Sequence, residues 1–182
     1  MPRAFRLRVD LVDSDPPIWR THSVPAGLPL DRLHGVLQTA MGWTNSHLHR
    51  FETEEGVSYQ HPFGMALEGD EDERGVRLDT LLVEPGDALL YEYDFGDGWE
   101  HAVVLEAVDP DGPDRAVCLD GENAGPPEDS GGTWRYNEIR PAFTAPGHEE
   151  HAELMEWIGP FDPDAFDVAA VNRALAGRRR SH

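Results

Sequence analysis

Two alternating stretches that meet at a short glycine-rich turn constrain the fold of this 182-residue chain more than any other feature. One side of residues 89–95 would carry Leu89, Tyr91, Tyr93 and Phe95, alternating with Leu90, Glu92 and Asp94. One side of residues 99–105 would carry Trp99, His101, Val103 and Leu105, alternating with Glu100, Ala102 and Val104. Strict alternation is typical of a strand with one buried face. Residues 96–98, Gly-Asp-Gly, supply the conformational freedom of a tight turn. The pattern therefore predicts an antiparallel β-hairpin.

Further alternation and helical spacing extend the hairpin into an α+β domain. We expect additional strands over residues 5–11, 18–24, 46–54 and 116–119. A helix over about Pro29–Met41 follows the second strand, and the C-terminal third is helical, with helices over residues 134–143, 149–158 and 163–177. Because strands dominate the first two thirds and helices the last, this order predicts a mainly antiparallel sheet and not an alternating parallel fold.

A single domain is expected over residues 1–177, because no long Gly/Ser or Pro-rich linker divides the chain. Within it, the run Glu68-Gly-Asp-Glu-Asp-Glu73 has few apolar anchors and strong self-repulsion, so we expect a mobile, solvated loop at about 64–75. Residues 178–182 begin with three consecutive arginines and are interpreted as a short, frayed basic tail.

Charge and cysteine content narrow the classes of function. The chain has 35 acidic and 15 basic residues, a net charge of −20. Binding to nucleic acid or to an anionic membrane depends largely on cationic side chains, so this charge argues against both. With Cys118 as the one cysteine, no internal disulfide can form. Since no signal peptide or apolar run of about 18 residues is visible either, we expect a cytoplasmic protein.

Ionisable side chains are concentrated in the predicted hairpin. Asp94, Asp97 and His101 would meet at one end of the sheet, where they could hold a divalent ion or act as acid and base. The alternative is structural: Asp97 belongs to the turn, Asp94 closes it through backbone N–H groups, and His101 packs among aromatic side chains. The sequence leaves both interpretations open.

A second group of candidate ligands is the pair His47 and His49. On a strand, residues two apart face the same side, a spacing compatible with two ligands of one metal. The remaining ligands would have to come from elsewhere in the chain. The resulting hypothesis is a metal site made of His47, His49, Asp94, Asp97 and His101.

A turn-rich segment near residue 130 adds two carboxylates. Glu128 and Asp129 could line a pocket, although capping the following helix is equally consistent with their position. No residue can be assigned a catalytic role from these patterns. The candidate pocket consists of His47, His49, Tyr93, Asp94, Asp97, Trp99, His101, Glu128 and Asp129.

Several blocks of the chain resemble the plasmid pRiA4b ORF-3-like family, whose members are often labelled insertion-sequence passenger proteins of TnpR type. The matching blocks are Pro16–Arg20, Asp31–His34, Ala40–His49, Tyr93–His101, Pro126–Asp129, Phe161–Pro163 and Asn172. The resemblance implies an α+β domain and no established reaction. Family members commonly carry further cysteines where Gly125 and Ser130 stand here, so a thiolate-based metal site would lack ligands in this chain.

Two function hypotheses follow. The first is a non-enzymatic domain, associated with plasmids or mobile elements, that binds a protein or small molecule in a cleft between the hairpin and the helix carrying Leu33 to Met41. The second is a metal-dependent, hydrolase-like enzyme in which the His/Asp group holds a divalent cation and Glu128 or Asp129 acts as a base. Nucleic-acid handling has the family label and the arginine tail behind it, and the net charge against it.

Overall fold

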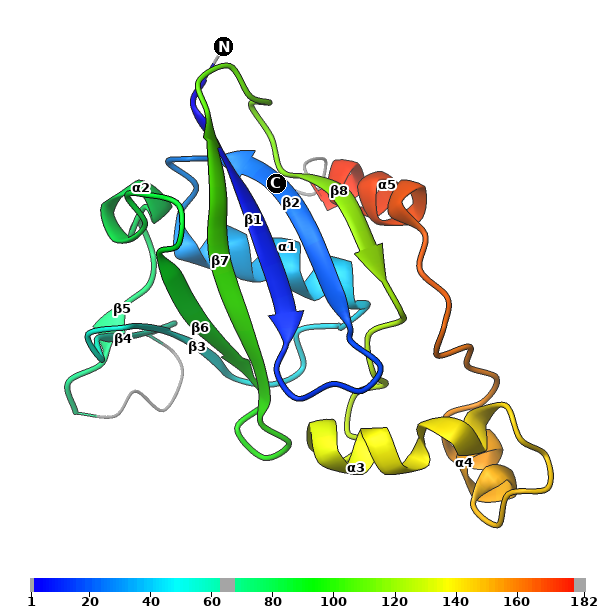
Figure 1. Ribbon diagram of the computed structural model, residues 1–182. Coiled ribbons are helices and arrows are strands. Elements are labelled where there is room, and N and C mark those ends of the chain that lie inside the picture. Colours follow the sequence, from blue (N-terminus) through cyan, green and yellow to red (C-terminus); the bar gives the residue numbers. More distant parts are fainter. Residues whose placement is uncertain (1, 63–67, 179–182) are drawn as a thin grey trace.

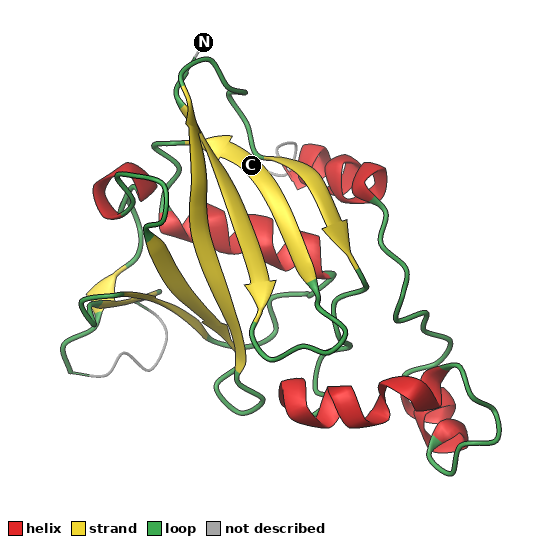
Figure 2. Ribbon diagram, viewed as in Figure 1, coloured by secondary structure: helices red, strands yellow, loops and turns green. Residues whose placement is uncertain are grey.

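An eight-stranded sheet organises the computed structural model, which describes residues 2–62 and 68–178 (Figures 1 and 2). Its strands are β1 (Ala4–Leu11), β2 (Trp19–Pro25), β3 (His49–Thr53), β4 (Ser58–Gln60), β5 (Glu71–Asp72), β6 (Ala88–Tyr93), β7 (Trp99–Asp109) and β8 (Val117–Glu122). They lie in the order β5-β4-β3-β6-β7-β1-β2-β8. All neighbouring pairs are antiparallel except β4 and β5, which are parallel.

Helices complete the α+β fold that the sequence predicts. They are α1 (Leu30–Met41), α2 (Leu78–Leu81), α3 (Gly132–Ile139), a 3-10 turn η1 (Arg140–Phe143), α4 (His151–Trp157) and α5 (Val168–Arg178). In Figure 1, α1 crosses one face of the sheet, α5 lies beside β8, and α3 and α4 extend below the ends of the strands. No helix in the described ranges is long and apolar enough to cross a membrane.

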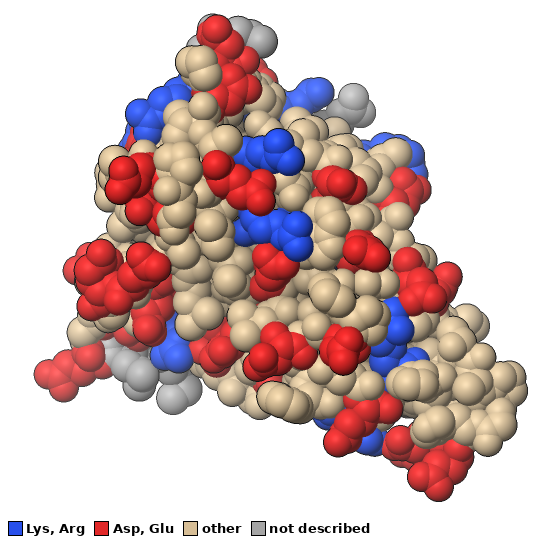
Figure 3. All heavy atoms as spheres, viewed as in Figure 1, with Lys and Arg blue, Asp and Glu red and all other residues tan. Residues whose placement is uncertain are grey.

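The predicted hairpin, β6 and β7, lies near the middle of the sheet. Its register pairs Tyr93 with Trp99 and Tyr91 with His101. Alternation places all four side chains on the buried face, as the sequence pattern predicts. Figure 3 shows acidic side chains scattered across the visible face of the molecule, more of them than basic ones, with other residues forming most of the surface.

Helix α1 covers the buried face with an apolar stripe. Leu30, Leu33 and Leu37 are fully or almost fully buried against the strands. The helix ends as predicted at Gly42, whose φ of 76° is the left-handed conformation that glycine adopts without strain. Between the end of α1 and the hairpin, the buried Trp43 stacks on Tyr93 at a ring-centroid distance of 4.9 Å.

The last helix begins later than predicted. Pro163 belongs to a turn closed by the side chain of Asp162, which accepts the backbone N–H of Asp164 at 3.0 Å. The helix starts at Val168, and Asp167 takes the capping role by accepting a backbone N–H from the first turn at 3.2 Å.

The acidic segment also differs from its expected form. Residues 64–67 lie outside the described residues, but Glu71–Asp72 forms β5, and the side chain of Glu73 is only 1% exposed. The acidic side chains of this segment repel one another, but Glu73 is still buried. The pairing of β4 with β5 places its side chain next to the buried imidazole of His49. Arg178 of the expected tail is the final residue of α5, and the rest lies outside the described residues.

Candidate metal centre

Three segments far apart in the chain meet beyond the ends of β3 and β6. They are the loop that joins α1 to β3, the turn of the β6–β7 hairpin, and the loop between β8 and α3. Each contributes one potential ligand, His47, Asp94 and Asp129 respectively. One ligand atom from each residue lies within 4.8 Å of the others. We call these three residues the His–Asp cluster.

The imidazole of His47 is the centre of the cluster. Its Nε2 lies 2.8 Å from Oδ1 of Asp129 and 3.6 Å from Oδ2 of Asp94. This nitrogen is inaccessible to solvent and makes no hydrogen bond, because the Asp94 oxygen is too distant and the N–H direction does not fit Asp129. An imidazole nitrogen and two carboxylate oxygens this close together are donors that a divalent cation could use.

Asp94 serves both the turn and the cluster. Its Oδ1 accepts the backbone N–H groups of Gly96 at 3.0 Å and Asp97 at 3.3 Å, as the structural interpretation of the sequence proposed. Its Oδ2 is thereby left facing His47. The backbone φ of Asp94 is 61°, and that of Asp129 is also 61°. Left-handed non-glycine residues are uncommon and tend to gather at functional sites.

Glu128 fixes the loop that carries Asp129. Its Oε1 accepts the hydroxyl of Tyr93 at 2.5 Å, and its Oε2 accepts the hydroxyl of Thr44 at 2.7 Å. The indole N–H of Trp43 reaches the same loop at the carbonyl of Pro126, at 2.8 Å. The loop before α3 is therefore held against both other segments of the site.

The surroundings of Tyr93 and Glu128 determine their protonation states. Burial, reinforced by the hydrogen bond to Glu128, raises the pKa of Tyr93 well above its ordinary value. Burial also acts to raise the pKa of Glu128, but the hydrogen bonds from Tyr93 and Thr44 outweigh it and leave the pKa lowered. Tyr93 therefore stays a donor and Glu128 an anion at neutral pH.

Asp97 joins the hairpin turn to the loop before α3 without belonging to the cluster. Its Oδ2 accepts the backbone N–H of Gly131 at 3.1 Å. Burial raises the pKa of Asp97, and the neighbouring carboxylates of Asp94 and Asp129 add to the effect. A bound cation would relieve this repulsion.

The structure separates His49 from His47. The strand β3 begins at His49, so His47 lies before the strand and the two-residue alternation does not apply to it. The Nε2 of His49 lies 2.8 and 2.9 Å from the two oxygens of Glu73, inside the protein. Burial lowers the pKa of His49 to about 4.

His101 is also held away from the cluster, among aromatic side chains. Its Nδ1 lies 3.2 Å from the carbonyl of Tyr91, and its ring meets Trp43 edge-on at 5.4 Å. Burial lowers its pKa to about 4. Trp99 is fully buried beside the same tryptophan, at a centroid distance of 5.9 Å. Of the nine pocket candidates, the structure thus brings His47, Asp94 and Asp129 together, with Tyr93, Asp97 and Glu128 around them.

Sequence reasoning missed two residues near the candidate ligands. Glu73, which contacts His49 and not the cluster, stood in a segment interpreted as solvated, and no local pattern points to its burial. Asn45 stands in one of the family blocks; its Oδ1 lies 2.8 Å from Nε2 of His34, and its N–H donates to Gln38 at 2.8 Å. Its φ of 56°, next to His47, is a conformation that asparagine tolerates better than most residues.

Three of the matching blocks, Ala40–His49, Tyr93–His101 and Pro126–Asp129, contribute the ligands of this site. A family model for plasmid pRiA4b ORF-3-like protein matches residues 3–170. The chain belongs to the plasmid pRiA4b ORF-3-like family.

Two known proteins of similar length resemble this chain in sequence or in fold. The uncharacterized protein y4hQ of Sinorhizobium fredii (strain NBRC 101917 / NGR234) is 42% identical over 169 residues, which cover 92% of this chain and 85% of that protein. The crystal structure of MM3350, a protein of unknown function from Methanosarcina mazei Go1, has a TM-score of 0.80 and 31% identity, and the match covers 92% of this chain and 96% of that one.

Cysteine does not contribute to the site in this member of the family. Cys118 is buried on β8, where its thiol lies 3.6 Å from the carbonyl of Asp120. Gly125 packs against the carbonyl of Met41, so closely that a Cβ would lie 2.1 Å from it. Ser130 donates its hydroxyl to the carbonyl of Pro127 at 2.6 Å. The donors of the His–Asp cluster are one imidazole nitrogen and carboxylate oxygens.

Proposed function

We propose that the protein is a binding domain whose site depends on a divalent cation held by His47, Asp94 and Asp129. The observation that carries the proposal is the buried Nε2 of His47, which faces two carboxylates without a hydrogen bond to either. Mixed nitrogen and oxygen donors favour Mn²⁺, Co²⁺ or Zn²⁺ over Ca²⁺ and Mg²⁺. Three protein ligands leave coordination positions through which a ligand could bind.

We propose the same cellular location and the same classes of partner that the sequence predicts. The single cysteine is free and buried, which supports a cytoplasmic location. The family name supports an association with plasmids. The net charge of −20 continues to argue against direct contact with nucleic acid, so a protein or a small molecule is the partner we propose.

Isothermal titration of the metal-free chain with MnCl₂ tests the proposal. We expect one Mn²⁺ per chain, and at least about a tenfold loss of affinity in His47→Ala and in Asp129→Asn. The controls are His148→Ala, which removes a histidine outside the cluster, and Glu138→Gln, which neutralises a carboxylate outside it. Absence of saturable binding of Mn²⁺, Co²⁺ and Zn²⁺ would overturn the proposal, as would equal affinities in the His47→Ala variant and the wild type.

A metal-assisted hydrolase is the second candidate, and Glu128 favours it. This carboxylate lies beside Asp129 and keeps its charge because Tyr93 and Thr44 donate to it. An anionic carboxylate next to a cation with open positions could accept the proton of a metal-bound water. Hydrolysis of p-nitrophenyl acetate or p-nitrophenyl phosphate that requires Mn²⁺ and is lost in Glu128→Gln would support it. Hydrolysis that is equal in the variant would exclude this role for Glu128.

A further inference from the structure

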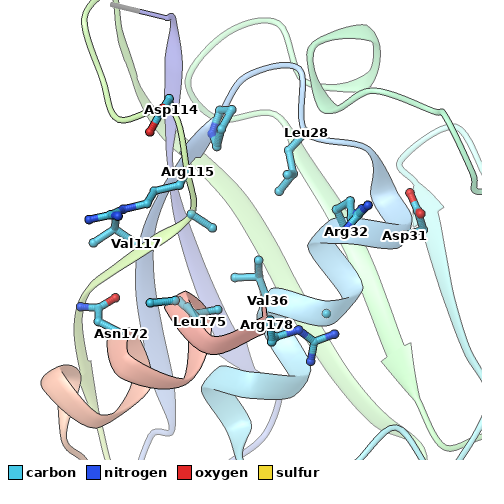
Figure 4. A pocket seen from close by; sticks show the side chains of 14 residues that line it. Leu28, Asp31, Arg32, Val36, Asp114, Arg115, Val117, Asn172, Leu175 and Arg178 are labelled. Atoms are coloured by element: carbon cyan, nitrogen blue, oxygen red, sulfur yellow. The ribbon is translucent and has the colours of Figure 1, made fainter. Parts of the chain in front are cut away.

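A cavity of about 720 Å³ lies between α1, α5, β8 and the end of β2 (Figure 4). It shares no lining residue with the His–Asp cluster and is larger than the cavities of about 260 and 270 Å³ that border Asp129 and Asp97. Sites for small organic ligands are typically about 300–1,000 Å³ and mostly apolar. The volume of this cavity lies within the range of sites for small organic ligands.

The interior of the cavity is apolar. Figure 4 shows Leu28, Val36 and Leu175 directed towards its middle from three different segments. Leu175 is the buried anchor of α5, and Val36 packs in the same small cluster with Cys118. Gly35 allows Arg178 of α5 to lie against α1 at the edge of the cavity, because a Cβ on this residue would lie 2.6 Å from the guanidinium.

The rim of the cavity differs in charge from the rest of this acidic chain. Most described arginines pair with a carboxylate, namely Arg6, Arg8, Arg50, Arg74, Arg77, Arg135, Arg140 and Arg173. The described arginines without a carboxylate partner are Arg3, Arg20, which binds backbone carbonyls, Arg32, Arg115 and Arg178. The last three of these line this cavity. The contact made by Arg178 is to the neutral hydroxyl of Thr39, at 3.2 Å.

Two carboxylates share the lining but do not neutralise these arginines. Asp31 lies in the first turn of α1, where the helix dipole stabilises a negative charge. In Figure 4 its carboxylate lies beyond Arg32 as seen from Leu175, and Asp114 lies above Arg115. With three arginines and two aspartates, the lining is net positive in a chain of net charge −20.

We propose that this cavity binds a small organic acid with an apolar body, such as a medium-chain carboxylate. The apolar chain would occupy the space between Leu28, Val36 and Leu175. The carboxylate would lie at the rim, where an unpaired guanidinium can form charge-assisted, bidentate hydrogen bonds. This site is separate from the metal centre and does not depend on it.

Titration with decanoate, below its micelle concentration, tests this site, with decanol and decyltrimethylammonium as neutral and cationic comparisons. We expect one decanoate per chain, bound at least about tenfold more tightly than either comparison ligand. The variant Val36→Trp fills the cavity and should lose at least about tenfold in affinity, whereas Val83→Trp adds the same side chain at an exposed position and should not. Far-UV circular dichroism checks that both variants fold.

A second variant tests the rim without touching the core. Arg115 is exposed, so Arg115→Glu should fold normally and bind decanoate at least about tenfold more weakly, while Arg173→Glu on α5 should bind as the wild type does. The His47→Ala variant should keep full affinity for decanoate even if it loses Mn²⁺. Decanol bound as tightly as decanoate, unchanged affinity in Val36→Trp or Arg115→Glu, or no saturable binding would each overturn the proposal.

Discussion

The imidazole rings of His34 and His49 stack face to face, with centroids 3.4 Å apart and planes 7° from parallel. Burial lowers the pKa of both to about 4; a charge on His49 lowers the pKa of His34 further, and a charge on His61 that of His49. Two charged rings could not stack at this distance inside a protein, so the pair is neutral at physiological pH.

The partners of His34 determine which of its nitrogens carries the proton. Nε2 lies 2.8 Å from the amide oxygen of Asn45, an acceptor, so this nitrogen donates. Nδ1 then accepts the hydroxyl of Tyr91 at 2.8 Å, and Gln38 donates to that hydroxyl at 3.0 Å. A buried polar network of this kind holds the loop before β3, and with it His47, against α1.

Removal of the Glu73 side chain should destabilise the fold. Glu73→Ala leaves the buried Nε2 of His49 without its partner, which costs about 1–3 kcal/mol of unfolding free energy. Urea denaturation at pH 8 measures the loss. Glu71→Ala is the control, because Glu71 lies two residues earlier, on β5, and is exposed. Equal stability of the two variants would show that the Glu73–His49 contact contributes nothing.

His22 should make the protein acid-sensitive. Its ring is fully buried and neither nitrogen has a hydrogen-bond partner among the described residues, so burial lowers its pKa to about 4. Between pH 6.5 and 4 the unfolded chain takes up a proton that the folded chain does not, so stability falls as the pH falls. At pH 5 this one group should cost about 2 kcal/mol relative to pH 8.

The variant His22→Leu measures that contribution. Its unfolding free energy should decline less between pH 8 and pH 5 than that of the wild type. Some decline remains, because the pKa of His101 is lowered in the same direction, while Glu73, with a pKa raised to about 7, acts in the opposite direction. His148→Leu is the control, and a decline as steep in His22→Leu as in that control would contradict the assignment.

Asn172 should protect the exposed edge of the sheet. Its amide accepts the N–H of Cys118 at 2.8 Å and donates to the carbonyl of the same residue at 2.9 Å. In Asn172→Leu the backbone N–H and C=O of Cys118, on this edge strand, both lose their partner. We expect this to lower the unfolding free energy by about 1–3 kcal/mol. Amide hydrogen exchange at Cys118 should become faster, and Arg173→Leu should leave it unchanged. Unaltered exchange in Asn172→Leu would show that water replaces the amide without loss.

Gly132 should be required for the metal centre. Its φ is 87°, and a Cβ there would lie 2.4 Å from the backbone oxygen of Asp97. We expect Gly132→Ala to lose about 1–3 kcal/mol of unfolding free energy and to bind Mn²⁺ more weakly, since the adjacent loop carries Asp129. Gly147→Ala is the matched control, because a Cβ there meets no atom within 4 Å. If the Gly132→Ala variant were destabilised but bound Mn²⁺ with wild-type affinity, the conformation of this loop would not be required for metal binding.

Much of the scaffold was predictable from local patterns. Alternation identified β1, β2 and the β6–β7 hairpin, and the spacing of Leu33 and Leu37 with a glycine after Met41 identified α1. These predictions succeed because strand and helix periods are properties of the covalent chain and hold before any long-range contact forms. The conformation of short segments such as β5, α2 and the start of α5 depends instead on what they pack against, and these were missed or misplaced.

The sequence by itself determined the charge, the family blocks and the kinds of ligand atom available at the candidate site. Only the tertiary structure decided which of them meet. It separated His47 from His49, placed Asp129 and not Asp97 beside His47, buried Glu73, and gathered three unpaired arginines around one cavity. Each of these outcomes depends on where a strand ends or which segments become neighbours across the sheet. A separation of tens of residues along the chain carries no information about such contacts, because long loops close at little entropic cost in many ways.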